Sequence, residues 1–136
     1  MEVIIDSNVL FRTLISQGDI LKLFFNPKLD IFAPEALKEE FINNKKEIIE
    51  KSSLSEDEFS TLSEILFSRI NFIPLENYKL FIPKARLFLG THEKDEDFVA
   101  LSLFKNAKIW TYEDLLFKIG LAISTKEISD ELSGLN

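Results

Sequence analysis

Acidic residues recur at the ends of short apolar segments in this chain of 136 residues. Asp6 directly follows an apolar run at 3–5. Asp95 opens the predicted helix that leads to a second apolar run at 109–110, and Glu113 comes shortly after that run. Carboxylates gathered at one point repel each other, which raises their pKa values. A divalent cation relieves the repulsion, and Mg²⁺ or Mn²⁺ suits such hard oxygen ligands. The pattern therefore predicts a Mg²⁺ or Mn²⁺ site able to activate water and to neutralise charge on a phosphodiester.

The composition removes several other kinds of chemistry. The chain has no cysteine and one histidine, His92, so thiolate zinc sites, disulfide scaffolds and multi-histidine metal sites within one chain are excluded. The formal net charge is −7. An acidic chain does not bind phosphate backbones through bulk charge, so a nucleic-acid function needs metal ions or local cations.

The apolar segments alternate with helical patterns, and this arrangement positions the acidic residues. The predicted strands lie at 3–5, 29–33, 70–73, 109–111 and 121–124. Such alternation predicts an α/β fold, a three-layer α/β/α architecture with a mostly parallel central sheet of about five strands. The segment 35–68 is helical without a strand, and we expect it to form a helical arm or hairpin beside the sheet. The length fits a single domain over residues 1–136.

Several residues are predicted to begin or interrupt helices. Asp6 or Ser7 has the residue type of an N-cap, and Ser55 with Glu58 three residues later forms a capping-box pattern. We expect Pro83 to kink or interrupt a helix over 76–89, and Thr125 to cap the last helix.

In open α/β sheets, function lies beyond the carboxyl ends of the strands. The acidic residues predicted near those ends are Asp6, Glu35, Glu39, Glu40, Asp95, Asp97, Glu113 and Asp114. A purely structural interpretation stays open for each of them, since Asp6 could act only as a cap and Asp95 and Asp97 could act only on the helix dipole.

Four segments resemble the motifs of PIN domains, the metal-dependent ribonuclease fold that includes toxins of toxin–antitoxin pairs. The run Val3–Leu10 is similar to an apolar strand followed by Asp-x-Asn, and Ala33–Phe41 resembles the helix with the family's glutamate. Asp95–Leu101 resembles Asp-x-x-Phe-x-Ala-Leu, and Ile109–Asp114 resembles a strand that ends in Thr-x-Asp. The resemblance covers nearly the whole chain.

The resemblance implies a metal-binding core of Asp6, Glu40 and Asp95. Glu40 is favoured over Glu39 because an apolar residue follows it, as in the family pattern. Glu113 follows Asp95 by 18 positions, which fits the family's separation of its last two acidic residues.

The Thr-x-Asp position departs from the pattern, because it holds Glu113 with Asp114 beside it. Either of these two residues is expected to complete the site, and both one-metal and two-metal arrangements stay open. By the same resemblance, Asn8 and Thr111 would orient the carboxylates or an attacking water.

RNA is the substrate that the resemblance implies. It also implies an antitoxin protein as a candidate partner and a homodimer as the expected assembly. The candidate RNA-binding cations are Arg12, Lys45, Lys46, Lys105 and Lys108. Tyr112 is a weaker candidate for stacking on a base, whereas we expect Trp110 to be core and His92 to be on the surface. The apolar residues Leu62, Ile65 and Leu66 are expected either in a dimer interface or in the core.

The first residues have neither a basic segment nor a long apolar one, and the apolar runs are far shorter than the ~20 residues of a membrane span. We therefore expect a cytoplasmic protein with no membrane partner. Two rival hypotheses stay open. One is a non-catalytic protein of the same fold that binds RNA or protein; the other is a receiver-like domain phosphorylated on Asp6.

Overall fold

A computed structural model describes residues 1–134, and the last two residues, 135–136, lie outside the described part. Its five-stranded sheet has the order β3-β2-β1-β4-β5, and all four neighbouring pairs are parallel. The strands are β1 (Glu2–Ile5), β2 (Asp30–Pro34), β3 (Ile70–Ile73), β4 (Lys108–Trp110) and β5 (Ala122–Ile123). The carboxyl ends of all five strands therefore lie at one edge of the sheet.

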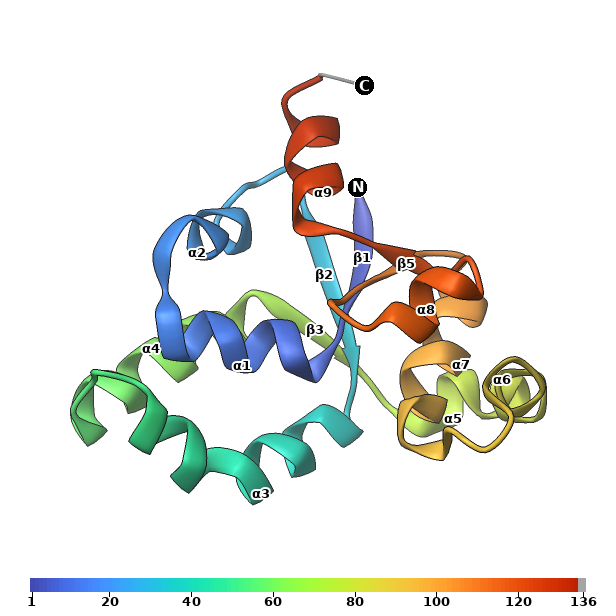
Figure 1. Cartoon of the computed structure of the whole chain (residues 1–136), viewed down its shortest axis with the longest axis horizontal. Coiled ribbons are helices and arrows are strands. Elements are labelled where there is room, and N and C mark those ends of the chain that lie inside the picture. Colours follow the sequence, from blue (N-terminus) through green and yellow to red (C-terminus); the bar gives the residue numbers. More distant parts are fainter. Residues whose placement is uncertain (135–136) are drawn as a thin grey trace.

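Helices cover both faces of this sheet. The first group is α1 (Ser7–Ser16), α2 (Gly18–Phe24), α3 (Ala36–Lys51) and α4 (Glu56–Ser68). The second is α5 (Leu75–Tyr78), the 3₁₀ turn η1 (Lys79–Phe81), α6 (Ile82–Leu89), the 3₁₀ turn η2 (Glu93–Asp95) and α7 (Glu96–Lys105). The short α8 (Asp114–Lys118) and α9 (Thr125–Leu132) complete the chain. Figure 1 shows α1–α4 on one side of the strands and α5–α7 on the other, so the predicted three-layer α/β/α architecture is confirmed.

The core explains why the central strand is apolar throughout. Val3, Ile4 and Ile5 are fully buried because β1 pairs on both edges and is covered on both faces. Trp110 at the end of β4 is also fully buried, and its indole N–H donates a hydrogen bond to the hydroxyl of Thr125 at 2.9 Å. The prediction that Trp110 belongs to the core is confirmed.

The helical segment after β2 forms a hairpin beside the sheet. Helix α3 contacts α1, and α4 contacts both α1 and β3. Phe41 on α3 stacks on Phe59 with 5.9 Å between ring centroids and meets Phe67 edge-on at 4.9 Å. These aromatic contacts hold the two helices together, so the hairpin is an integral part of one layer (Figure 1).

Two of the predicted helix signals are changed by the structure. The last helix is capped by Ser124, not Thr125, because Ser124 and Glu127 form a reciprocal capping box. The segment predicted as one helix over 76–89 is divided into α5, η1 and α6. Pro83 lies in the first turn of α6, where its missing N–H removes no helical hydrogen bond, so it helps to begin a helix. The predicted capping box of Ser55 and Glu58 is present.

The strand order separates this fold from a receiver domain. Receiver-type sheets have the order 2-1-3-4-5, whereas here β1 lies at the centre between β2 and β4. The receiver-like hypothesis is therefore wrong. Within residues 1–134, none of the helices combines the length and the apolar character that a membrane crossing requires.

Candidate metal centre

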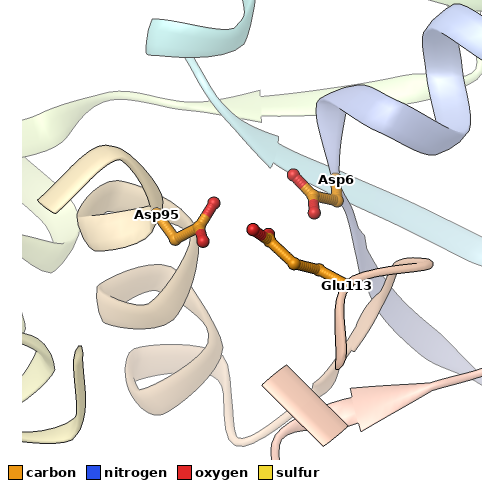
Figure 2. Close-up of side chains that lie close together, drawn as sticks. All are labelled: Asp6, Asp95 and Glu113. Atoms are coloured by element: carbon orange, nitrogen blue, oxygen red, sulfur yellow. The ribbon is translucent and has the colours of Figure 1, made fainter. Parts of the chain in front are cut away.

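Three carboxylates from distant parts of the sequence meet at the carboxyl edge of the sheet. Asp6 follows β1, Asp95 ends η2 just before α7, and Glu113 lies in the loop after β4. One carboxylate oxygen from each lies within 4.8 Å of the others, and Figure 2 shows the three side chains pointing toward one another. We call these three residues the acidic cluster. They meet because β1 and β4 are neighbours in the sheet and α7 packs across both.

Both carboxylate oxygens of Asp6 accept a hydrogen bond. Its Oδ1 accepts a hydrogen bond from the backbone N–H of Ser7 at 2.8 Å, which also caps α1. Its Oδ2 accepts one from the hydroxyl of Thr111 at 2.7 Å. The backbone N–H of Asp6 donates to the carbonyl of Trp110 at 3.0 Å, continuing the ladder between β1 and β4. The side chain is only 2% exposed, and its orientation is therefore fixed.

The hydroxyl of Thr111 links the two strand ends. Besides donating to Asp6, it accepts a hydrogen bond from the backbone N–H of Glu113 at 3.0 Å. The side-chain amide of Asn8 also donates to it at 3.4 Å. Thr111 thus contacts both Asp6 and the backbone of Glu113, and Asn8 contacts Thr111 from the cleft side.

The charges of the acidic cluster are poorly compensated. Burial, a hydrogen bond with Glu113, and the negative charges of Asp6 and Glu113 raise the pKa of Asp95 to about 7. Burial also raises the pKa of Asp6, although the hydrogen bonds from Thr111 and Ser7 act in the opposite direction. This is the electrostatic cost that close carboxylates carry when no cation lies between them.

Glu40 on α3 faces the same space. It lines a cleft of about 210 Å³, which we call the acidic cleft, together with Asp6, Ser7, Asn8, Lys94, Asp95 and Glu113. Burial raises the pKa of Glu40, and the hydroxyl of Ser7 acts in the opposite direction. Glu40 thus stands at the wall of the cleft, outside the group of three whose oxygens meet within 4.8 Å.

The donor set fits a hard divalent cation. The acidic cluster offers only oxygen ligands, and no cysteine or histidine lies among them. The Oδ2 atom of Asp95 and the Oδ1 atom of Asn8 are buried without a hydrogen-bond partner among the described residues. The three carboxylate oxygens lie within 4.8 Å of one another, near enough for one ion to contact all of them after small side-chain rotations. Unpaired buried oxygens facing a polar cleft are what such an ion would satisfy.

Two neighbouring carboxylates, considered as alternatives from the sequence, have different surroundings. Asp114 is exposed at the start of α8 and is not among the three whose oxygens meet. Asp97, the second residue of α7, lines a separate pocket of about 470 Å³ with Glu39. The structure therefore brings Glu113 into the acidic cluster and leaves Asp114, Asp97 and Glu39 outside it.

The five cations considered for RNA contact are dispersed. Lys108 begins β4 and Lys105 pairs with Glu2 at 3.5 Å, so both lie at the amino edge of the sheet, opposite the acidic cleft. Lys45 and Lys46 are exposed on α3, beyond Glu40. Arg12 lies over the ring of Tyr112 at 5.3 Å, and Tyr112 is adjacent to Glu113. Of the five, Arg12 is the one whose side chain contacts the loop of the acidic cluster. His92 is exposed, as predicted.

Lys94 is a residue of the cleft that the sequence reasoning did not select. Its ammonium lies 3.9 Å from a carboxylate oxygen of Glu113. The available signal was its position directly before Asp95, as a single cation within an acidic segment. That signal is weak by itself, because exposed lysines beside carboxylates are common on protein surfaces.

Comparison with known proteins agrees with this geometry. A sequence model of the PIN domain matches residues 4–133, nearly the whole chain and all of the acidic cluster. No curated protein matches the sequence. The family's members are generally metal-dependent nucleases, which is the chemistry that a cluster of buried carboxylates at a sheet edge suits. The fold, the acidic cluster and the match together show that the chain belongs to the PIN domain family.

Proposed function

We propose that this protein is a divalent-metal-dependent endoribonuclease that hydrolyses RNA phosphodiester bonds. The observation that carries the proposal is the convergence of Asp6, Asp95 and Glu113 within 4.8 Å at the carboxyl edge of the sheet. Glu40, which lines the same cleft, would complete the carboxylate set, with Mg²⁺ or Mn²⁺ as the ion. When bound, the ion supplies a Lewis acid that activates water and neutralises charge on the phosphodiester.

Hydrogen bonds from Thr111 and Ser7 fix the orientation of the Asp6 carboxylate. Thr111 fixes one oxygen of Asp6, and Ser7 fixes the other. The same hydroxyl of Thr111 anchors the backbone of Glu113 and keeps its loop beside β1. Because these donors are already in place, little reorganisation is needed when the site is loaded.

The glutamate at the Thr-x-Asp position is compatible with activity. Glu113 is one methylene longer than aspartate, yet its carboxylate oxygen lies within the acidic cluster. Its geometry therefore supports a catalytic protein over a non-catalytic one. The non-catalytic alternative predicts that Glu113 cannot contribute to ion binding, and it is tested by the variants below.

Single-stranded RNA is the substrate that the surface beside the cleft favours. Tyr112 is 40% exposed next to Glu113, and Arg12 stacks over its ring. An exposed aromatic ring backed by a guanidinium is a platform on which an unpaired base stacks. Because Tyr112 directly precedes Glu113 in the chain, a base stacked on its ring would lie beside the acidic cluster.

The groove between α3 and α4 is the surface on which we expect a partner chain to bind. The apolar groove between α3 and α4 has a volume of about 400 Å³ and includes Phe41, Phe59 and Phe67 in its lining. Ile65, also on α4, is 42% exposed, whereas Leu66 is fully buried in the core. An antitoxin segment or a second copy of the chain would bury this apolar surface, which is the interface we expect if the protein is a toxin or a dimer.

The experiment that tests the proposed function uses a labelled pool of single-stranded RNA. Purified protein is incubated with Mg²⁺, with Mn²⁺ and with EDTA, beside the variant Asp6→Asn. We expect cleavage that requires a divalent ion and is lost in Asp6→Asn, because the amide keeps the size but removes the ligand charge. Cleavage that persists in EDTA or in the variant would refute the metal mechanism, and RNA binding without cleavage would favour the non-catalytic alternative.

A further inference from the structure

The acidic cleft contains one positive side chain among the described residues that line it. Lys94 stands on η2, immediately before Asp95, and its ammonium lies 3.9 Å from Glu113. The remaining charged residues of the cleft are carboxylates. A phosphate group entering the cleft therefore meets four carboxylates, two neutral polar side chains and one cation, Lys94.

Lys94 is held loosely. Its side chain is 82% exposed, and its contact with Glu113 is at the outer limit for an ion pair. Exposed pairs of this kind contribute little to folding stability, so a stabilising role does not account for a lysine at this position. Its flexible stem and three N–H donors are free to reorient toward an incoming phosphate oxygen.

The backbone beside Lys94 is fixed although its side chain is not. Asp95 is 4% exposed and lies within the acidic cluster, and α7 begins at the next residue. The backbone position of Lys94 therefore keeps its ammonium within one side-chain length of the acidic cleft, which it lines. Its positive charge reaches Asp6, Glu40 and Asp95, whose pKa values are raised mainly by burial and on which Lys94 acts in the opposite direction.

We propose that Lys94 binds a phosphate group of the RNA backbone at the mouth of the acidic cleft, as the phosphate-binding residue of this site. The proposal rests on the proposed nuclease function, and it adds a cation that holds the substrate's phosphate against the repulsion of the carboxylates. An ammonium–phosphate hydrogen bond is charge-assisted and is stronger than a neutral one. The contact is to the backbone, so it is independent of base sequence.

The chain offers a matched control. Lys22 on α2 is also 82% exposed and is also ion-paired, with Asp19 at 3.4 Å. Lys22→Met and Lys94→Met remove the same charge from side chains of equal exposure, and only the second changes the acidic cleft. Lys94→Arg keeps the positive charge at the cleft and serves as the conservative variant.

The test measures binding of a short fluorescein-labelled RNA strand by anisotropy, in Ca²⁺ to limit cleavage and again in EDTA. For Lys94→Met we expect the Kd to rise about tenfold at about 50 mM salt in both conditions, and the slope of log affinity against log salt to fall by about 0.7. Lys94→Arg should stay within about threefold of the wild type, and Lys22→Met within about twofold. Melting curves of all variants establish that each one is folded.

The outcomes separate this inference from the nuclease proposal. If Lys94→Met binds RNA as Lys22→Met does while the wild type binds and cleaves RNA, the assignment of Lys94 is overturned and the nuclease stands. If the wild type binds RNA but never cleaves it, and Lys94→Met binds more weakly, Lys94 remains the phosphate-binding residue of a non-catalytic protein. A wild type that neither binds nor cleaves RNA overturns both proposals.

Discussion

Two acidic pockets lie side by side in this protein, and only one has the features of a metal centre. In the acidic cleft, Asp6 and Asp95 are buried and their oxygens meet that of Glu113 within 4.8 Å. The neighbouring pocket is larger, about 470 Å³, and includes Glu35, Glu39, Glu76 and Asp97 in its lining.

In the neighbouring pocket, acidic side chains lie near one another without converging on one point. Its three glutamates are exposed, and its carboxylates do not form a group with converging oxygens among the described residues. Water solvates the exposed glutamates at little cost. Burial and the charges of Glu96 and Glu39 raise the pKa of Asp97, so what sets this pocket apart is the lack of converging oxygens among its described residues. The comparison indicates that strand ends and hydrogen bonds, and not acidic composition alone, bring carboxylates together. The following variants test that difference.

The largest difference should appear when each of the two aspartates at the start of α7 is replaced by asparagine. Asp95→Asn removes a ligand charge from the acidic cluster, and we expect cleavage to fall about a thousandfold, as loss of metal-assisted charge stabilisation implies. Asp97→Asn changes the neighbouring pocket, and we expect less than about a threefold change. Single-turnover cleavage of one RNA at saturating Mn²⁺ measures both. Equal losses would remove the distinction between the pockets.

Thr111→Val should have the next largest effect. The variant loses the hydroxyl that donates to Asp6 and accepts from the backbone of Glu113, so both carboxylates gain freedom. Loss of such a supporting group typically costs about 10- to 100-fold in metal affinity or activity. The concentration of Mn²⁺ that gives half-maximal cleavage measures the effect. Thr125→Val is the control, because its hydroxyl accepts from Trp110 away from the cluster; an equal change in both variants would refute the role of Thr111.

The pH dependence of stability should report the electrostatic cost of burying Asp95 in the acidic cluster. Burial raises the pKa of Asp95 to about 7 from the unfolded value of 3.8, so the folded state binds this proton more tightly. Its contribution to stability is fully present below about pH 4 and is lost as the pH rises through about 7. In EDTA, Asp95→Asn should therefore melt at least about 3 °C higher than the wild type at about pH 8, with a smaller advantage at about pH 5.

Thermal melting of both proteins in matched buffers checks this prediction. A wild type that is as stable as Asp95→Asn at both pH values would show that the acidic cluster carries no electrostatic cost. Adding Mn²⁺ should raise the melting temperature of the wild type more at the higher pH, because ligands must be deprotonated to bind an ion.

The smallest effect is expected at Asp114. This residue is exposed at the start of α8, and its neighbour Glu113 already fills the cluster position. We expect Asp114→Ala to cleave RNA within about twofold of the wild type, whereas Glu113→Ala loses most of the activity. A side-by-side rate measurement decides between them, and the reverse order would assign the fourth acidic position to Asp114.

The sequence predicted the fold well because its signals were local. Fully apolar strands such as 3–5 indicated a sheet buried on both faces, and the alternation with helices indicated the parallel order. Errors arose where neighbouring residues compete for one role. Ser124 replaces Thr125 as the cap because only Ser124 has a partner three residues later, at Glu127, for a reciprocal box.

The site was less accessible to sequence reasoning. The order of motifs placed Asp6 and Glu113 after predicted strands and Asp95 at the start of a helix. The choice between Glu113 and Asp114 depends on how the loop after β4 is anchored to Thr111. Which cations lie near the acidic cleft was harder to predict. Lys105 and Lys108 are near the cluster in sequence but lie at the opposite edge of the sheet. Lys94 was overlooked because its importance depends on which cleft it enters, a property of tertiary structure.

Calorimetric titration with Mn²⁺ at about pH 8 tests the central claim most directly, comparing the wild type with Asp6→Asn and Asp97→Asn. If the acidic cluster is the metal centre, the wild type and Asp97→Asn bind Mn²⁺ alike, and Asp6→Asn binds it at least about tenfold more weakly. Equal Mn²⁺ binding by the wild type and Asp6→Asn, or loss of binding only in Asp97→Asn, would contradict the account.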